Sequence, residues 1–212
     1  IAKITFNEGA TIFEVIIQVQ KYGDVIIVDD GSSDSTGQVA KETSATVLFH
    51  KSNFGYEVAL STGIEYAVNN GYSYIVTTDA DGELKSYGIS KVIEMLKQNN
   101  LIVAGNRDRK NRIIESFFGM LSFFIFGIHD PLCGMKGYSA KIYEKYGFFD
   151  RNRMIGTELL ALALRDKITI QEVSVNVAKR SGNSRFGGIL TSFFKIIRVI
   201  YLFLRISLQK KV

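Results

Sequence analysis

The 212-residue chain has one cysteine, one proline and no tryptophan. A single cysteine cannot form an internal disulfide bond, and no cluster of cysteine and histidine indicates structural zinc. This scarcity of cysteine is expected of a protein in a reducing, cytosolic setting. No repeat of about 20–50 residues and no low-complexity tract is present, which excludes solenoid and collagen-like architectures. Because 46% of the residues are hydrophobic and 22% charged, intrinsic disorder is excluded as well.

Acidic residues are absent from residues 173–212, a stretch that holds eight lysines and arginines. The whole chain carries a formal net charge of +5, so residues 1–172 carry −3. A basic, apolar end on an acidic body differs from the even basic surface of a nucleic-acid-binding protein, and we expect no nucleic acid partner. The pattern indicates an anionic surface or an anionic ligand near the C-terminus.

Strand and helix patterns alternate over the first half of the chain. Apolar runs that are typical of buried parallel strands lie at residues 1–6, 25–28, 45–49, 74–78 and 102–105. Apolar residues at helical spacing lie between them, at residues 12–19, 59–67 and 89–96. This order predicts an α/β fold with a mostly parallel central sheet, right-handed crossovers and helices on both faces of the sheet.

The pattern changes after Gly105. Residues 117–128 form an aromatic-rich run that is too short to span a bilayer, so we expect either a buried core helix or an interfacial helix that faces an acceptor. Residues 157–164 have a helical pattern. Residues 169–177 alternate as a strand with one exposed face.

The C-terminal segment at residues 189–208 is rich in Phe, Ile and Leu, with Lys195, Arg198 and Arg205 at helical spacing. In a membrane-spanning helix each cation would cost roughly 3 kcal/mol. A helix lying flat in the membrane interface, its cations toward lipid headgroups, is therefore favoured. The alternative is a helix that packs on its own domain or on the partner in a homodimer. We divide the chain into an α/β domain at 1–187 and a basic amphipathic helix at 188–212.

Two acidic clusters, at residues 29–34 and 78–83, directly follow predicted strands. Ligands of open parallel sheets bind at the carboxyl ends of the strands. Asp79 and Asp81 alternate across Ala80, so in an extended segment both carboxylates point to one side. A small number of hard oxygen ligands suits Mg²⁺ or Mn²⁺, with water and substrate phosphate completing the coordination. The alternative for either cluster is an Asp-rich turn that caps the next helix.

Other common sites are not visible in the sequence. The chain has neither a G-x-G-x-x-G fingerprint after a strand nor a P-loop, and it has no serine nucleophile elbow. His50 and His129 each stand alone, and we expect both to be structural residues. Cys133 is predicted to be a small packing residue, because nothing near it in sequence favours a reactive thiolate.

A series of motifs in order resembles the family 2 glycosyltransferases of the GT-A fold, nearest to the dolichyl- or polyprenyl-phosphate sugar synthases. The resemblance covers about residues 4–187. The motifs are Asn7-Glu8, Val28-Asp29-Asp30-Gly31-Ser32-Ser33-Asp34, Asn53-x-Gly55, Asp79-Ala80-Asp81-Gly82, Asp130-Pro131-x-Cys133-Gly134-Met135-Lys136 and Arg180-Ser181-Gly182-Asn183-Ser184-Arg185.

The resemblance implies a role for each matching position. Four residues would surround the nucleotide base and ribose: Asn7, Glu8, Asp29 and Asp30. Asp79 and Asp81 would hold Mg²⁺ or Mn²⁺ and the donor diphosphate, which makes Asp81 a catalytic residue, and Glu83 would be a further metal ligand. The residues that would contact phosphates of the donor or the acceptor are Lys136, Arg180, Ser184 and Arg185.

The implied activity is inverting transfer of a sugar from a UDP- or GDP-sugar to a polyprenyl or dolichyl phosphate, at the cytoplasmic face of the membrane. A phosphate monoester is largely ionised at neutral pH because its second pKa is about 6, so it needs cations rather than a base. A saccharide hydroxyl acceptor would need a base, and Glu158 lies where family members with such acceptors place a catalytic acid residue. The alternatives are therefore transfer to a saccharide with Glu158 as base, or a nucleotide-sugar-binding module without turnover.

Overall fold

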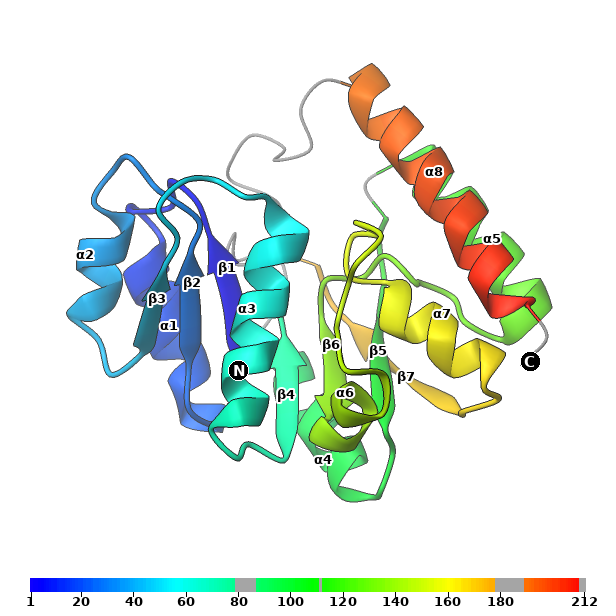
Figure 1. Ribbon diagram of the computed structural model, residues 1–212, viewed down its shortest axis with the longest axis horizontal. Helices are drawn as coiled ribbons and strands as arrows, with labels where there is room; N and C mark the ends of the chain where they lie inside the picture. The colour runs from blue at the N-terminus through cyan, green and yellow to red at the C-terminus, as the bar shows by residue number, and fades with distance from the viewer. Residues whose placement is uncertain (79–86, 111, 178–188, 210–212) are drawn as a thin grey trace.

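The computed structural model describes residues 1–78, 87–110, 112–177 and 189–209 (Figure 1). One seven-stranded sheet runs through this part of the chain in the order β3-β2-β1-β4-β6-β5-β7. The strands are β1 (Ala2–Thr5), β2 (Ile26–Asp29), β3 (Thr46–Phe49), β4 (Tyr74–Thr77), β5 (Ile102–Arg107), β6 (Lys136–Ser139) and β7 (Ile170–Val175). The helices are α1 (Ile12–Val19), α2 (Thr36–Lys41), α3 (Tyr56–Asn69), α4 (Tyr87–Lys97), α5 (Ile113–Phe126), α6 (Ala140–Tyr146), α7 (Glu158–Arg165) and α8 (Ile189–Ser207), with a 3₁₀ turn at Gln20–Tyr22.

The predicted strands are all present, but the sheet contains one strand that the sequence did not predict. β6 lies between β4 and β5 and is antiparallel to both. Its sequence, Lys-Gly-Tyr-Ser, lacks the apolar run of a buried strand. Gly137 is required there, because an added Cβ would lie 2.4 Å from a Val92 methyl group of α4. The sheet is therefore mostly parallel, as expected, with one antiparallel insertion.

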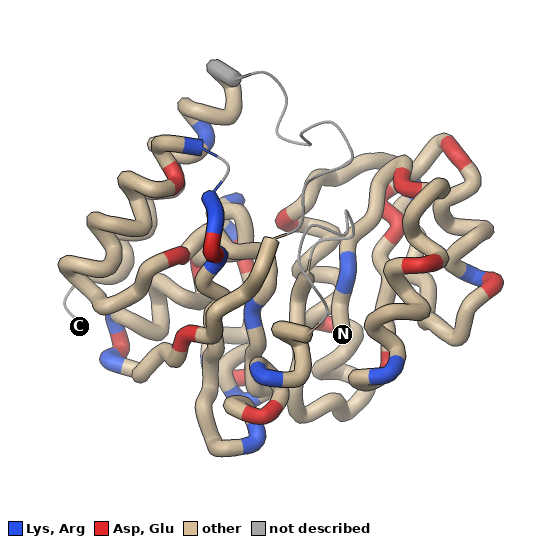
Figure 2. The backbone as a smooth tube through the Cα atoms, turned by 180° about the vertical axis from the view of Figure 1, so that it is seen from behind, with Lys and Arg blue, Asp and Glu red and all other residues tan. Residues whose placement is uncertain are grey.

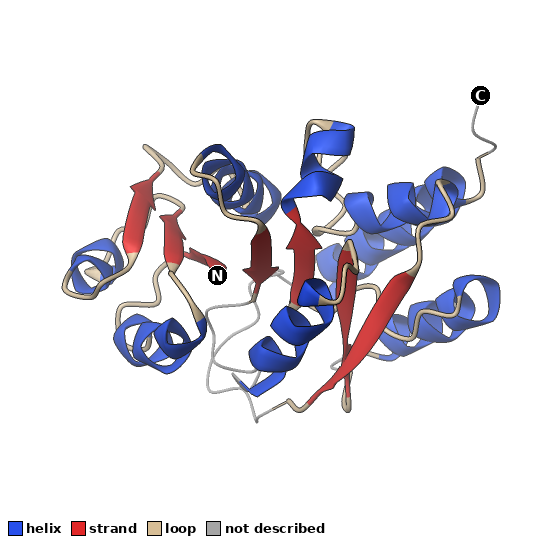
Figure 3. Cartoon of the chain, turned by 90° about the horizontal axis from the view of Figure 1, so that it is seen from below, coloured by secondary structure: helices blue, strands red, loops and turns tan. Residues whose placement is uncertain are grey.

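Helices cover both faces of the sheet, as the alternating pattern predicted (Figure 3). One apolar cluster lies under α3, α7 and α8, and the other lies under α1 and α4. The bare face of α3 at Ala59, Gly63 and Ala67 packs on the sheet, where a Cβ added to Gly63 would lie 3.2 Å from Val28 Cγ2. Close packing of these small residues positions the N-terminus of α3 near the end of β2.

Helix α5 contains most of the aromatic run and is half-buried. Phe118 is fully buried on its inner face and packs edge-on against Phe203 of α8, with ring centroids 5.3 Å apart. Its outer face is an apolar stripe with exposed fractions of 91% for Ile113, 54% for Phe117 and 78% for Phe124. The buried-core alternative therefore does not hold for the outer face of this helix.

Helix α8 packs on its own domain, against α5 and α7 (Figure 1). Two of its three cations contact the protein, which corrects the expectation that they point toward lipid headgroups. Lys195 lies 3.0 Å from the Glu57 carboxylate of α3, and Arg198 donates hydrogen bonds to the carbonyl oxygens of Asn152 and Arg153. The buried Glu57 carboxylate and the carbonyl oxygens of an exposed loop attract these cations inward, and the sequence alone does not show those partners.

The outer face of α8 is apolar and aromatic, with Phe193, Phe194, Ile197 and Tyr201 exposed. No acidic residue lies along this helix, and the red segment that overlaps it in Figure 2 belongs to α5. Arg198 and Arg205 follow Phe194 and Tyr201 by four residues, so each cation neighbours an exposed ring. Within the described ranges, no helix combines the length and the hydropathy that a bilayer-spanning segment requires.

Candidate functional site

The candidate site lies where β1 and β2 end. The two strands pair in parallel with Thr5 opposite Asp29, so the residues that follow them meet at one rim of the sheet. Asn7, Glu8, Asp29 and Asp30 are brought together there, and their contact with a nucleotide stays a prediction. Six predicted site residues lie outside the described part of the chain: Asp79, Asp81, Glu83, Arg180, Ser184 and Arg185.

Asn7 joins the loop after β1 to the loop after β2. Its backbone has a left-handed φ of 55°, a conformation that asparagine tolerates better than most residues. The Asn7 side-chain oxygen accepts a hydrogen bond from the backbone N–H of Ser33 at 2.9 Å, and the Asn7 backbone N–H donates to Ser32 Oγ at 3.0 Å. Asp29, which is buried, accepts from the Ser32 N–H at 3.0 Å. Backbone N–H groups of the acidic loop therefore bind the side chains of Asp29 and Asn7, and these bonds fix the loop in place.

Glu8 is held at the same rim through Thr36, the first residue of α2. The Glu8 backbone N–H donates to Thr36 Oγ1 at 2.8 Å, and the Thr11 hydroxyl lies 3.3 Å from the Glu8 carboxylate. The Thr36 hydroxyl also donates to Asp34. Burial raises the pKa of Asp34, but hydrogen bonds from Thr36 and Gly9 outweigh it and lower the pKa below its usual value. Asp34 is therefore held in its ionised form next to the start of α2.

Asp30 is buried and faces the loop after β3. Its carboxylate accepts hydrogen bonds from the N–H groups of Phe54 at 3.0 Å and Gly55 at 2.8 Å, and it lies 2.6 Å from His50 Nδ1. Gly31 lets the two loops approach each other. Its φ is 75°, and a Cβ added there would lie only 2.5 Å from the Ser52 carbonyl carbon. Asp30 therefore holds the Asn53-x-Gly55 motif against the acidic loop. His50 is a partnered structural residue, as expected.

Lys136 lies at the first position of β6, opposite Thr77 of β4. It is buried, and its ammonium donates a hydrogen bond to the Cys133 carbonyl oxygen at 2.6 Å. The Thr77 hydroxyl donates to the Gly134 carbonyl oxygen at 3.1 Å. Cys133 is fully buried, and burial raises its thiol pKa to about 12, so it is a packing residue as predicted. The turn before Lys136 is thus fastened to the end of β4, two residues before Asp79.

A buried ion pair lies beside this turn, and no motif of the sequence indicates it. Arg107, at the end of β5, donates from Nε to Asp130 Oδ2 at 2.7 Å and from Nη2 to Asp130 Oδ1 at 3.0 Å. Its Nη2 also donates to Glu115 of α5 at 3.1 Å. Burial lowers the pKa of the Arg107 guanidinium, but Asp130 and Glu115 more than offset this and raise it. A separation of 23 residues hides this pair from any local sequence pattern.

Glu158 is buried at the start of α7 and holds the loop before it. Its Oε2 accepts the N–H groups of Arg151 and Asn152, both at 2.7 Å, and its Oε1 accepts the Asn152 side-chain amide at 2.5 Å. Asp150, which belongs to none of the sequence motifs, accepts hydrogen bonds from the N–H groups of Met154 and Gly156 in the same loop. Burial, with a contribution from Glu158, raises the pKa of Asp150 to about 7.

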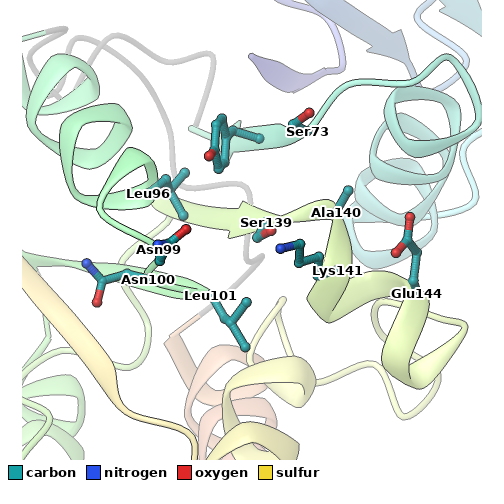
Figure 4. A pocket seen from close by; sticks show the side chains of 10 residues that line it. Ser73, Leu96, Asn99, Asn100, Leu101, Ser139, Ala140, Lys141 and Glu144 are labelled. Atoms are coloured by element: carbon teal, nitrogen blue, oxygen red, sulfur yellow. The ribbon is translucent and has the colours of Figure 1, made fainter.

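A hollow of about 650 Å³ lies on the opposite rim, at the start of β4 and the end of β6 (Figure 4). Ser73, Ser139, Lys141 and Glu144 are among the residues that line it. It is separate from the predicted site, because β4 ends at the other rim. Among the described residues, no three histidine, cysteine, aspartate or glutamate side chains gather as a metal site.

The chain is similar to a family of known proteins. The profile of a family described as Glycosyl transferase family 2 matches residues 1–162. A polyprenol monophosphomannose synthase from Mycolicibacterium smegmatis is 24% identical over 196 residues, which cover 81% of this chain and 74% of that protein. A UDP-N-acetylglucosamine–dolichyl-phosphate N-acetylglucosaminyltransferase from Methanococcus voltae is 28% identical over 204 residues, covering 80% of this chain and 81% of that protein.

A similar solved structure supports the fold. The glucosyl-3-phosphoglycerate synthase from Mycobacterium tuberculosis, in complex with Mn²⁺ and UDP-glucose, superposes with a TM-score of 0.76 at 20% identity. The superposition covers 97% of this chain and 77% of that one. At this level of identity the likeness shows the GT-A fold.

Proposed function

Since the chain belongs to glycosyltransferase family 2 and is a glycosyltransferase, we propose that it transfers a sugar from a UDP- or GDP-sugar to a polyprenyl or dolichyl phosphate. The anomeric configuration is inverted. The observation that carries the choice of acceptor is the geometry of Glu158, whose carboxylate is buried and occupied by three hydrogen bonds from the loop before it. The two relatives whose names specify a polyprenol or dolichyl phosphate support the same acceptor class.

The donor binds at the rim formed by β1 and β2 in this proposal. Asn7, Glu8 and Asp29 line the rim and contact the base and ribose. Asp30 contributes mainly by holding residues 53–55, because its carboxylate already accepts two N–H groups of that loop. The left-handed residues Asn7 and Gly31 let the two loops approach closely. The base-binding surface is therefore formed before the donor arrives, which reduces the cost of ordering it.

The reaction needs no proton transfer when the acceptor is a phosphate. An ionised phosphate oxygen attacks the anomeric carbon from the face opposite the leaving group. The new carbon–oxygen bond forms as the bond to the donor diphosphate breaks, and the electron pair leaves with the diphosphate. Lys136 and the basic residues Arg180 and Arg185, with Ser184, bind the phosphates in this proposal. Cations are what the step requires, because both partners are anionic.

The donor diphosphate requires charge neutralisation, for which we propose a divalent cation, Mg²⁺ or Mn²⁺. Asp79, Asp81 and Glu83 are the residues that would hold it, since the segment has the D-x-D spacing of hard oxygen ligands. When bound, such a cation acts as a Lewis acid that stabilises the charge on the leaving diphosphate. The Thr77 hydroxyl, bonded to Gly134, joins the strand that carries this segment to the turn that carries Lys136.

We further propose that the protein works peripherally at the cytoplasmic face of a membrane, with residues 188–212 in the interface. The exposed rings of α8 and the absence of acidic residues beyond position 172 support this placement, because they suit an anionic lipid surface. The apolar stripe of α5 adds exposed hydrophobic area of a kind that monomeric soluble proteins seldom leave uncovered. Pairing of these faces in a homodimer is the competing explanation.

The proposal is tested by product formation with purified protein, a panel of UDP- and GDP-sugars, and either a polyprenyl phosphate or a saccharide acceptor. We expect a glycosylated lipid phosphate only with Mg²⁺ or Mn²⁺, and a loss of about 100-fold or more in Asp81→Asn, because removal of one key electrostatic group typically costs this much. Asp24→Asn is the matched control, since Asp24 bonds Tyr72 at the opposite rim. Product on the saccharide alone would favour the hydroxyl alternative. Donor binding without any turnover would favour a binding module.

A further inference from the structure

The turn at residues 130–136 is held by side chains from three neighbouring strands. Asp130 is 1% exposed, and both of its carboxylate oxygens accept hydrogen bonds from Arg107 at the end of β5. The Glu172 carboxylate of β7 accepts the backbone N–H of Asp130 at 3.3 Å. At the other end of the turn, Thr77 of β4 bonds the Gly134 carbonyl oxygen and Lys136 bonds the Cys133 carbonyl oxygen.

Arg107 is the strongest of these fastenings. Its planar guanidinium matches the carboxylate with two parallel hydrogen bonds, a geometry that lysine cannot reproduce. The Arg107 backbone N–H also points at Asp130 Oδ2, 3.2 Å away. Within the turn, the Cys133 N–H donates to the Asp130 carbonyl oxygen at 3.2 Å, so the position of Asp130 determines the position of Cys133. The Cys133 carbonyl oxygen in turn accepts from the Lys136 ammonium.

These contacts form one chain from Arg107 through Asp130 and Cys133 to Lys136. We propose that Arg107 is a positioning residue for phosphate binding, which sets the turn at residues 130–136 so that Lys136 is held where the acceptor phosphate binds. This inference rests on the proposed function, because it assigns Lys136 to the acceptor phosphate. It adds a residue of β5 that the motif series does not contain.

The same guanidinium joins the turn to helix α5. Glu115, 6% exposed, accepts from Arg107 on one oxygen and from Arg112 on the other at 2.8 Å. Gly119, one turn further along α5, lies so close to the residue before Asp130 that an added Cβ would be 2.2 Å from the His129 carbonyl oxygen. The helix with the exposed apolar stripe therefore rests directly on the start of the turn.

The test compares Arg107→Lys with wild type in steady-state kinetics on a polyprenyl phosphate. We expect KM for this acceptor to rise about 10- to 100-fold, because small misplacement of a binding group has effects of this size, while the thermal shift produced by the donor stays unchanged. Arg165→Lys is the matched control, because Arg165 also forms an ion pair, with Asp166, but at the far end of α7. The control is expected to change KM less than about 2-fold.

A double-mutant cycle with Lys136→Met separates positioning from general stability. If Arg107 acts through Lys136, Arg107→Lys costs less than about 2-fold in the Lys136→Met background. Losses that multiply in the double variant would overturn the proposal. An Arg107→Lys variant with a lower kcat and an unchanged KM would also overturn the proposal. If Arg107→Lys does not fold, Asp130→Asn replaces it in the same cycle, since it removes the same charge pair with little change of shape.

Amide hydrogen exchange tests the positioning independently of the acceptor. In Arg107→Lys we expect the N–H groups of Asp130 and of residues 132–136 to exchange at least about 10-fold faster than in wild type, because the contact that protects the turn is weakened. Unchanged exchange overturns the inference whatever the substrate. Faster exchange in a protein that glycosylates no lipid phosphate would keep the positioning role of Arg107 and reject the proposed acceptor instead.

Discussion

Lys195 of α8 lies 3.0 Å from Glu57 of α3, although 138 residues separate them in the chain. Glu57 is in the first turn of the helix that begins just after Gly55, and it is 6% exposed. The C-terminal helix is therefore joined to the element that follows the loop held by Asp30. This contact makes α8 part of the domain's structure as well as a candidate for membrane contact.

Replacing Lys195 with Met is expected to lower the free energy of unfolding by about 1–3 kcal/mol, because the Glu57 carboxylate would lose its cation while it stays buried. Urea denaturation measures the difference. Arg205→Met is the control on the same helix, where an exposed side chain is expected to contribute within about 0.5 kcal/mol. Adding Glu57→Leu to Lys195→Met should recover part of the loss. Equal stabilities of Lys195→Met and wild type would show that the ion pair contributes nothing.

Asp150 predicts a specific dependence of stability on pH. Its pKa is raised from 3.8 to about 7 in the folded protein, first by burial and then by Glu158. Between these values the folded state binds a proton that the unfolded state has lost, so the free energy of unfolding falls as pH rises through this window. The contribution is on the order of 4 kcal/mol.

Asp150→Asn should remove this pH dependence, because the amide does not titrate. Urea midpoints at pH 5 and pH 7.5 provide the measurement, and the drop between them is expected to be smaller in the variant than in wild type. Glu14→Gln, which alters an exposed carboxylate of α1, serves as the control. An equal or larger drop in the urea midpoint of Asp150→Asn, compared with wild type, would contradict the prediction.

Glu158→Gln distinguishes the two acceptor classes. The substitution replaces one acceptor oxygen with an N–H donor that faces the N–H groups of residues 151 and 152, so a stability loss of about 1–3 kcal/mol is expected. On a polyprenyl phosphate we expect the rate to fall less than about 10-fold, since no base is required. A fall of about 100-fold or more, measured well below the unfolding temperature, would support base catalysis on a hydroxyl acceptor.

Membrane contact is predicted to depend on the exposed rings of α8. Phe194 is 66% exposed and neighbours Arg198 on the helix surface. Phe194→Glu is expected to reduce sedimentation with anionic phospholipid vesicles at least about 10-fold. The substitution removes apolar area that the membrane would bury and adds a negative charge, which anionic lipid repels. Phe13→Glu on α1, where the ring is 44% exposed, is the control. Equal sedimentation of both variants and wild type would place the bilayer elsewhere. A change of oligomeric state in Phe194→Glu alone would favour the homodimer.

Helix and strand positions were largely predictable from the sequence, because burial on one or both faces leaves a periodic pattern. The stripe of Ile12, Val15, Ile16 and Val19 is buried, and the bare face of α3 packs on the sheet. The strand at Lys136–Ser139 was missed because its residues are polar or small and its pairing is antiparallel. Its burial comes from β4, β5 and α4, which are far away in sequence.

The candidate site divides in the same way. The acidic loop at residues 29–34 was predicted because parallel strands bring their carboxyl ends to one rim. The partners of Asp30, at positions 50, 54 and 55, and the pairing of Arg107 with Asp130 were not predicted, because hydrogen bonds across 20 or more residues leave no local pattern. The inward direction of Lys195 and Arg198 was missed for the same reason.

Sequence alone therefore determined the class of fold, the family and the rim at which chemistry is expected, since these follow from periodicity and from short motifs whose residues are neighbours in the chain. Only the tertiary structure decided which carboxylates are occupied in holding loops, as Asp30 and Glu158 are, and which cations turn inward. Those outcomes depend on distances between separate elements, and such distances exist only once the chain has packed.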